Sequence, residues 1–148
     1  MKHEGTIIAS EKKKLFKYNT HEQKIEWETV FKNEIVGISR IENFVFVLTT
    51  SWGSYSTSMI NYQTGAIKWK KDIVLYNVHI LNDLIIFIDT TREVVSISAE
   101  TGNENFRVKT GFRWTSPKMV LADQKIYLFS KKKTMLLNLN TGSLVESK

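Results

Sequence analysis

The residue types that perform catalysis or bind metals are few and scattered in this sequence. Its three histidines, His3, His21 and His79, lie in the N-terminal segment, in an expected turn and in an expected strand, without the spacing of metal ligands. Cysteine is absent, which excludes disulfides, thiolate metal sites and a lipid-anchored cysteine. We therefore expect the histidines to be surface or packing residues, and we expect no bound metal and no cofactor.

Motifs of covalent and phosphate chemistry are also missing. The sequence holds no G-x-S-x-G elbow, P-loop, G-x-G-x-x-G fingerprint or H-E-x-x-H pair. Asp89 is the one acid that directly follows a strongly apolar run, Leu84–Ile88. A carboxylate at a strand end more often accepts backbone hydrogen bonds or faces solvent than it serves as a general base. We therefore expect a protein that is not an enzyme.

Basic residues are the functional side chains that the sequence does gather. The chain has a formal net charge of +6 at pH 7, and Lys-Lys-Lys occurs twice, at Lys12–Lys14 and at Lys131–Lys133. This charge favours an anionic partner, while lysine-rich turns also serve solubility. Aromatic residues accompany the basic segments at Trp52, Tyr55, Phe112 and Trp114. We interpret residues 51–56, which contain Trp52 and Tyr55, as an exposed loop.

A repeated hairpin is the scaffold that positions these residues. Its template is residues 59–69, Met-Ile-Asn-Tyr-Gln-Thr-Gly-Ala-Ile-Lys-Trp, in which a half-apolar strand and a Thr-Gly turn precede a strand that ends on Trp69. Near-copies place the turn threonines at Thr20, Thr64, Thr101 and Thr141, roughly 40 residues apart. That period indicates a propeller or an array of repeats.

Two further strands are expected before each hairpin. A moderately apolar strand comes first, at residues 35–41, 74–80 and 119–122, and a nearly continuous apolar run follows at 44–48, 84–88 and 126–129. Such runs indicate strands that are buried on both faces. Each unit is thus a four-stranded antiparallel meander that needs a neighbouring sheet to bury its apolar faces. Residues 5–34 hold only three strands, at 6–9, 15–18 and 24–28.

We expect one all-β domain over residues 1–148, with repeat units at about 5–34, 35–72, 73–112 and 113–148. Hydrophobic residues form 42% of the chain, which excludes a disordered protein. No apolar run approaches the roughly 20 residues of a membrane helix. The N-terminal residues lack the apolar region of an export signal. We therefore expect a cytoplasmic protein that does not bind membranes.

The hairpin sequences resemble the repeat of pyrroloquinoline-quinone-type (PQQ-like) β-propellers. Residues 61–69 carry that family's apolar strand, Thr-Gly turn and docking tryptophan, and residues 138–145, Asn-Leu-Asn-Thr-Gly-Ser-Leu-Val, repeat the turn. His21-Glu22 replaces the turn glycine of the first unit, and Phe106 and Glu146 stand where the tryptophan is expected. The resemblance implies a small β-propeller of about four antiparallel blades, the first lacking its inner strand.

The family resemblance carries further expectations about packing and assembly. Trp27, Trp69 and Phe106 occupy the position of blade-docking residues, so we expect them in the core. Members of the family usually have seven or eight blades. We favour a closed four-bladed monomer over a homodimer that covers exposed sheet edges. The family's quinone enzymes use calcium and commonly a vicinal disulfide, and this cysteine-free chain is not expected to share that chemistry.

Charge sorted by turn type suggests two unlike faces. In a blade, the loops between strands two and three lie on the same face as the connections between blades, and the remaining turns lie on the other. The first face collects Lys12, Lys13, Lys14, Lys32, Lys70, Lys71, Arg92, Arg107, Lys109, Arg113, Lys118, Lys131, Lys132 and Lys133 against five acids. The other collects Glu22, Glu42, Asp83, Glu100 and Asp123 against three cations. The two lysine triplets are expected to be neighbours in a closed ring.

Three functions fit these features. The first is a protein-binding module, such as an inhibitor or immunity-type protein, and its expected contact residues are Lys12, Lys13, Lys14, Trp52, Tyr55, Arg92, Arg113, Trp114, Lys131, Lys132 and Lys133. The second is a nucleic-acid-binding protein that uses the same basic, aromatic face, without a known motif and with Lys rather than Arg. The third is an enzyme with a site at the blade axis. We favour the first.

Overall fold

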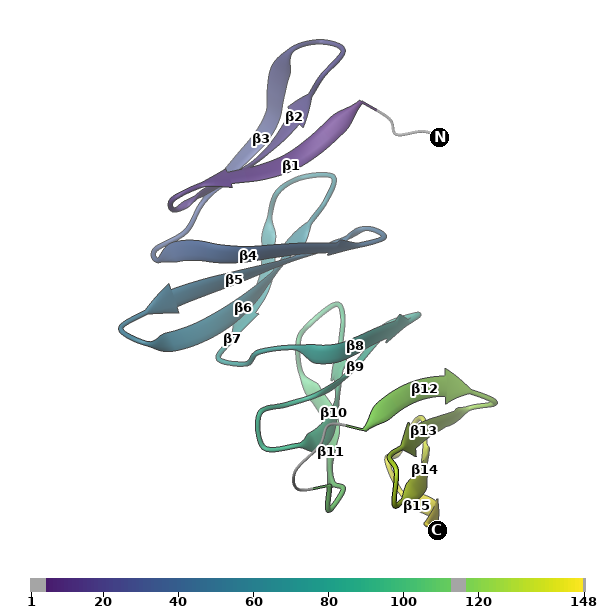
Figure 1. Cartoon of the computed structure of the whole chain (residues 1–148). Helices are drawn as coiled ribbons and strands as arrows, with labels where there is room; N and C mark the ends of the chain where they lie inside the picture. Colours follow the sequence, from purple (N-terminus) through teal and green to yellow (C-terminus); the bar gives the residue numbers. More distant parts are fainter. Residues whose placement is uncertain (1–4, 113–116, 148) are drawn as a thin grey trace. The chain divides into compact units, whose positions relative to one another are not determined.

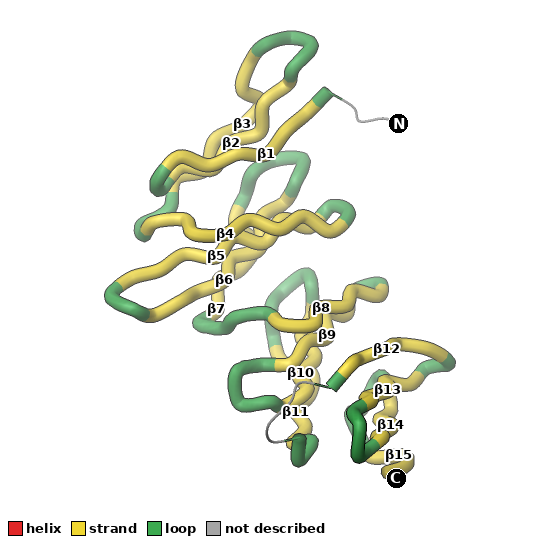
Figure 2. Tube along the Cα trace, in the orientation of Figure 1, coloured by secondary structure: helices red, strands yellow, loops and turns green. Residues whose placement is uncertain are grey.

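A computed structural model of the chain describes residues 5–112 and 117–147. The described residues form strands and turns, which build four antiparallel sheets and confirm the all-β prediction (Figures 1 and 2). The chain divides into two compact units, Met1–Val74 and Leu75–Lys148. Each unit contains two of the sheets, and each is described by itself.

The first unit contains a three-stranded and a four-stranded sheet. The first sheet has the order β1-β2-β3 and the second the order β4-β5-β6-β7. The strands are β1 (Thr6–Glu11), β2 (Lys14–Asn19), β3 (Lys24–Val30), β4 (Glu34–Ile41), β5 (Phe44–Ser51), β6 (Ser54–Asn61) and β7 (Ile67–Lys71). The first sheet therefore lacks the counterpart of β4, as the sequence predicts.

The second unit contains two four-stranded sheets with the orders β8-β9-β10-β11 and β12-β13-β14-β15. The strands are β8 (Tyr76–Leu81), β9 (Leu84–Ile88), β10 (Glu93–Ser98), β11 (Glu104–Lys109), β12 (Lys118–Ala122), β13 (Lys125–Phe129), β14 (Thr134–Asn138) and β15 (Leu144–Ser147). Every sheet is thus a meander of sequential strands. The extent of the single predicted domain and the closure of a ring stay predictions.

An asparagine at the start of the turn stabilises the repeated hairpin, and it recurs in more than one repeat. The side-chain oxygen of Asn61 accepts the backbone N–H groups of Gln63 and Thr64, at 2.8 and 3.0 Å. The Gly65 N–H then donates to the Asn61 carbonyl at 2.8 Å, and Gly65 has a φ of +79°. An Asx turn that ends on a left-handed residue explains why Asn and Gly recur at this spacing. Asn138 and Gly142 repeat the arrangement in the last sheet.

Each unit buries its core between its two sheets. In the first unit Leu15, Phe31, Ile35, Val45, Val47, Ile60 and Tyr62 form one buried cluster. The apolar run of β9 is almost wholly buried, as predicted. The run of β13 differs from the prediction, because Ile126 and Leu128 are buried while Phe129 is 41% exposed. Alternate residues of β13 therefore face a core, and the strand is buried on one face only.

An aromatic side chain joins the two sheets in each unit. Trp27 on β3 lies against Gly65, so close that a Cβ atom at position 65 would come within 2.5 Å of the indole. The Trp27 Nε1–H also donates to the carbonyl oxygen of Tyr62 at 2.9 Å. In the second unit Phe106 lies against Gly142 in the same way. The Thr-Gly turn is thus the docking place for the aromatic residue of the preceding sheet, and Trp27 and Phe106 are partly buried against the core clusters rather than within them.

Candidate partner-binding surface

The first unit presents its lysine triplet at the turn between β1 and β2. Lys12, Lys13 and Lys14 are all exposed, and Lys12 has a φ of +57°. The carbonyl oxygens of Lys12 and Lys13 accept the N–H groups of Ile35 and Phe31, at 2.8 and 2.7 Å. These bonds fix the turn against the connection between β3 and β4. The backbone is therefore anchored while the side chains reach solvent.

Trp52 forms the tip of the neighbouring hairpin. Trp52 and Gly53 are the two central residues between β5 and β6, with φ values of +53° and +83°. Positive φ at both positions is the requirement of a type I′ turn, which prefers Asn-Gly. The Trp52 side chain is fully exposed, at 101% of its reference area, although it is the largest apolar side chain. Trp52 therefore combines a strained backbone conformation with a fully exposed side chain.

The prediction of a loop over residues 51–56 is wrong, because most of these residues belong to strands β5 and β6. The ladder between β5 and β6 continues to the pair Ser51 and Ser54, so only Trp52 and Gly53 lie outside the strands. Tyr55 belongs to β6 and is 48% exposed. A run of Ser, Thr and Tyr hides the strand from a hydrophobicity pattern, while Gly53 allows the tight reversal.

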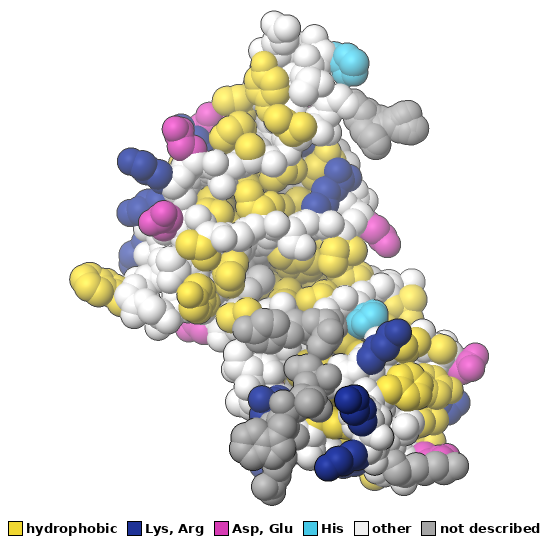
Figure 3. Space-filling view, viewed as in Figure 1, with side chains coloured by type: hydrophobic (Ala, Val, Ile, Leu, Met, Phe, Trp, Pro, Cys, Tyr) yellow, Lys and Arg dark blue, Asp and Glu magenta, His cyan; other side chains and the backbone are white. Residues whose placement is uncertain are grey.

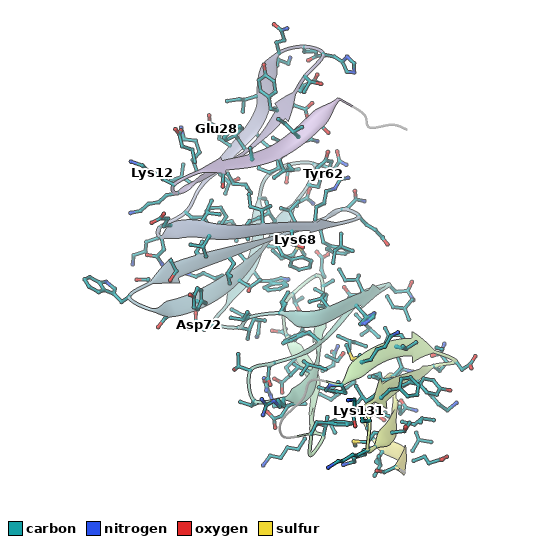
Figure 4. All side chains as sticks on the ribbon, viewed as in Figure 1. Lys12, Glu28, Tyr62, Lys68, Asp72 and Lys131 are labelled. Carbon is teal, nitrogen blue, oxygen red and sulfur yellow. The ribbon has the colours of Figure 1, made fainter. Side chains whose placement is uncertain are left out.

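Backbone pairing brings the lysine turn and the tryptophan tip to the same end of the first unit. Ile35, which bonds to Lys12, is the partner of Thr49 across β4 and β5. Thr49 lies three residues before Trp52, about 10 Å along a strand. Figures 1 and 3 show both tips at one end of the unit, with basic side chains beside an apolar knob, and Figure 4 labels Lys12 there. We name Lys12, Lys13, Lys14, Trp52 and Tyr55 the Lys–Trp surface.

The second unit gathers Arg92 and the second lysine triplet. The Thr110 hydroxyl donates to the Arg92 carbonyl oxygen at 2.9 Å, and Lys133 Nζ donates to the Thr110 carbonyl oxygen at 3.0 Å. These contacts join the β9–β10 turn to the β13–β14 turn, where Lys131 and Lys132 are exposed. Figure 4 labels Lys131. Arg113 and Trp114 lie outside the described residues. The predicted adjacency of the two triplets joins residues of different units, and it stays a prediction.

Arg107 belongs to an ion cluster rather than to a contact surface. Its guanidinium binds Asp89, Glu93 at 2.9 Å and Glu104 at 3.2 Å. The Asp89 carboxylate also accepts the N–H groups of Thr91 and Glu93, at 3.0 and 3.1 Å. Asp89 is thus the strand-end carboxylate expected from the sequence. The basic character of this end comes from the other cations.

Hydrogen bonds set the charge state of this cluster. Partial burial by itself raises the pKa of Asp89, but the Thr91 hydroxyl, Arg107 and two backbone N–H groups together hold that pKa below its ordinary value of 3.8. Hydrogen bonding to Glu93 and Asp89 raises the pKa of Arg107 against the opposing effect of its burial. Both groups therefore stay ionised at neutral pH.

Both ends of the sheets place residues other than glycine in left-handed turn positions. The turns between strands two and three place Lys12, Trp52 and Arg92 at positive φ. The turns at the opposite end place Gln23, Glu42, Asn82, Asp123 and Gln124 there. Asn82 and Asp123 tolerate this conformation, whereas Lys12, Trp52 and Arg92 each accept a strain of about 1 kcal/mol, as do Gln23, Glu42 and Gln124. Sequence reasoning missed this signal, which a turn-by-turn alignment of the repeats reveals.

Other kinds of site find little support in the described part of the chain. Residues 5–112 and 117–147 contain no cluster of three His, Cys, Asp or Glu side chains that could hold a metal ion. Within the same ranges no helix is long and apolar enough to cross a membrane. His79 lies in β8, where the sequence places it.

Comparison with known proteins gives likeness in structure and none in sequence. No protein-family model matches the chain, and no curated protein matches its sequence. Among solved structures, BamB from Moraxella catarrhalis superposes with a TM-score of 0.66 at 16% identity, over 97% of this chain and 46% of that one. The computationally designed Ika8 protein superposes with a TM-score of 0.63 at 8% identity, over 100% of this chain and 47% of that one.

Quinone-dependent enzymes show the same likeness over a smaller share of their length. A quinohemoprotein alcohol dehydrogenase from Pseudomonas putida superposes with a TM-score of 0.56 at 12% identity, over 97% of this chain and 32% of that one. The chain spans less than half the length of each of these three proteins. At such identities the likeness concerns the fold alone. With its four sheets of three or four antiparallel strands, the chain has the fold of a PQQ-like β-propeller.

Proposed function

We propose that this chain is a non-catalytic, cytoplasmic protein-binding module and that the Lys–Trp surface of the first unit contacts the partner. The observation that carries the proposal is the exposed Trp52 indole on a turn that prefers asparagine. Scattered exposed apolar residues are common. A fully exposed tryptophan that also strains its backbone does not stabilise the fold, and a smaller residue at this position would increase stability. A contact with another molecule accounts for its presence.

The surroundings of Trp52 suit an acidic protein surface. Trp and Tyr are the side chains that dominate binding energy at interfaces, and Tyr55 is half-exposed on the same hairpin. Lys12 and Lys13 at the neighbouring tip add positive charge, which steers association with an acidic partner and selects against basic ones. An inhibitor or immunity-type role belongs to this class of function.

The test compares two substitutions at residues with positive φ, which lie at opposite ends of the same sheet. Trp52→Asn removes the indole and relieves the left-handed strain, and Glu42→Asn relieves the strain at the β4–β5 turn, where φ is +55°. The full chain is immobilised and exposed to lysate of its native source, and a stoichiometric partner is identified and quantified. We expect Trp52→Asn to weaken its capture by about 2 kcal/mol or more, and Glu42→Asn to leave capture unchanged.

Two results would overturn the proposal. Equal capture by the wild type and Trp52→Asn would show that the indole is not an anchor. Retention of nucleic acid that disappears at moderate salt, without a protein partner, would instead favour a nucleic-acid-binding protein.

A further inference from the structure

The first sheet leaves one side of β1 without a paired strand. Strand β1 pairs with β2, and in the described part of the chain no strand pairs with its other side. The Thr20 N–H donates to the Gly5 carbonyl oxygen at 2.7 Å, which sets the alternation of hydrogen bonds along the ladder between β1 and β2. The N–H and C=O groups of Thr6, Ile8 and Ser10 therefore point away from β2. We name these three residues the β1 edge.

The second unit shows what covers the corresponding edge there. Strand β9 is the counterpart of β1 in that unit, and it pairs with β8. Strand β8 also contacts β12, the first strand of the following sheet. The first unit has the counterpart of β12, which is β4, and β4 contacts β1 (Figure 1). Among the described residues of the first unit, a counterpart of β8 is missing.

Strand β4 is exposed where the missing strand would lie. Ile38 is the partner of Val47 and lies three residues before the end of β4, as Met119, the partner of Leu128, lies three residues before the end of β12. Both side chains face the preceding sheet, because Val47 and Leu128 belong to the cores formed with that sheet. Met119 is 4% exposed, whereas Ile38 is 36% exposed. The missing strand therefore leaves an apolar side chain of β4 uncovered.

Arg40 lies two residues further along the same face of β4. Its guanidinium lies over the Tyr62 ring, with Cζ 3.7 Å from the ring centre, and its Nε–H donates to the Glu42 carbonyl oxygen at 2.8 Å. The Tyr62 hydroxyl is 2.6 Å from the Thr6 hydroxyl, so Arg40 lies near the start of the β1 edge. Among the described residues, its two terminal nitrogens have no partner. An arginine held in this way is preorganised to bind a carboxylate.

We propose that the β1 edge binds an extended segment of the protein partner, which joins the first sheet as its missing strand and runs antiparallel to β1. The inference rests on the proposed function, because it assigns the segment to the partner that the Lys–Trp surface contacts. Lys12 directly follows β1, so the two surfaces adjoin. Main-chain hydrogen bonds to the β1 edge hold the segment, and its side chains give specificity.

The surface that the segment covers determines its chemistry. Side chains opposite the β1 edge point toward the second sheet, as Ile8 does where it packs against the core cluster. Apolar side chains at two of these positions cover Ile38, and a carboxylate opposite Thr6 binds Arg40. A second copy of this chain does not fit, because pairing two β1 edges would bring the second sheet of one copy into the place of β4 in the other.

The test titrates the uniformly ¹⁵N-labelled full chain with the acetylated and amidated heptapeptide Thr-Val-Thr-Ile-Thr-Glu-Thr. Its Val, Ile and Glu residues alternate, so that they lie opposite Ser10, Ile8 and Thr6. We expect saturable shifts of these three amide signals and slower hydrogen exchange of the same amides in the complex than in the free chain. A peptide with N-methyl groups on Val, Ile and Glu keeps the side chains but loses the donors that face β1, so it should not bind.

Two variants locate the binding on the chain. Ser10→Pro removes an N–H group that points away from β2, a position where an edge strand tolerates proline, and it should weaken peptide binding about tenfold or more. Arg40→Gln should weaken it about tenfold, because it removes the partner of the carboxylate. The matched control is Lys70→Gln on β7, at the opposite edge of the second sheet, which should bind the peptide as the wild type does. The amide spectrum of each variant reports its folding.

The outcomes separate this inference from the proposed function. Saturable binding that weakens in Ser10→Pro and Arg40→Gln supports the β1 edge as the site. Shifts that fail to saturate, equal binding of the N-methylated peptide, or protected edge amides in the free chain overturn the inference. Trp52→Asn should bind the peptide as the wild type does. If Ser10→Pro captures the partner normally while Trp52→Asn does not, this inference is overturned and the proposed function stands.

Discussion

Arg107 on β11 forms an ion pair with Asp89, which follows the last residue of β9. Strand β10 lies between these two strands in the sheet, so the ion pair spans β10. The same guanidinium binds Glu93 at the start of β10, which ties three strands together at one end. Arg107 therefore binds the two carboxylates, Asp89 and Glu93, that flank the β9–β10 turn.

The Asp89 carboxylate makes stability depend on pH. Its pKa is lower in the folded state than the ordinary 3.8, so the unfolded state binds more protons as pH falls. The stabilisation is fully present above that ordinary value and is lost as pH falls through the lower folded value. We expect Asp89→Asn to flatten the loss of stability between about pH 5 and pH 2. Urea denaturation at several pH values measures the free energy of unfolding of both proteins. If its dependence on pH is the same in Asp89→Asn as in the wild type, the Asp89 carboxylate is not the cause.

The Trp27 indole combines packing with one hydrogen bond, and two substitutions separate them. Trp27→Phe keeps an aromatic ring, as the second unit does with Phe106, but removes the donor to the Tyr62 carbonyl. We expect Trp27→Phe to lower the free energy of unfolding by about 1 kcal/mol. Trp27→Ala should lower it by about 3 kcal/mol or more, because it also removes the packing. Equal losses in chemical denaturation would mean that the ring does not dock the sheets.

Gly65 and Gly53 allow the docking contact to be measured apart from backbone strain. Both have positive φ, at +79° and +83°, so alanine strains either turn by about 1 kcal/mol. An added Cβ meets no atom within 4 Å at Gly53, but comes within 2.5 Å of the Trp27 ring at Gly65. We expect Gly65→Ala to cost about 2 kcal/mol more than Gly53→Ala in thermal or urea unfolding. Matching losses would place Trp27 away from the turn.

The lysines of the second triplet should differ in their effect on stability. Lys133 donates to the Thr110 carbonyl oxygen at 3.0 Å, whereas Lys131 and Lys132 are exposed. We expect Lys133→Ser to cost about 1 kcal/mol. The double change of Lys131 and Lys132 to Ser should stay within about 0.5 kcal/mol of the wild type. Equal melting temperatures for both variants would contradict the anchoring of Lys133.

The strands and the docking contacts could be predicted because they depend on local patterns. The apolar run Leu84–Ile88 is strand β9 with the predicted bounds. Trp27 and Phe106 lie in the packing position that the repeat implied. Each of these features follows from a few neighbouring residues that recur in most of the repeats, so one repeat supports the interpretation of another.

The features that escaped prediction depend on partners distant in the sequence. The sequence predicts Arg107 on the basic face, because nothing near it in the sequence indicates that Asp89 binds it. Lys133 was grouped with two solvated lysines, although it bonds to a residue 23 positions earlier. The sequence predicts a loop around Trp52 because the flanking strands are polar, whereas the structure has a two-residue turn there. Charge and polarity patterns place residues on an end of a sheet but do not choose their partners.

The difference between the tip turns and the docking turns has a consequence for protein engineering. Lys12, Trp52 and Arg92 occupy strained tips outside the core, while Asn61 and Gly65 hold the turn that docks the neighbouring sheet. A library that randomises the three tip positions should therefore keep the fold in most of its members, since many replacements relieve strain. The same randomisation at the docking turns should destroy it. The three tip positions can therefore vary in sequence while the docking turns keep the sheets together.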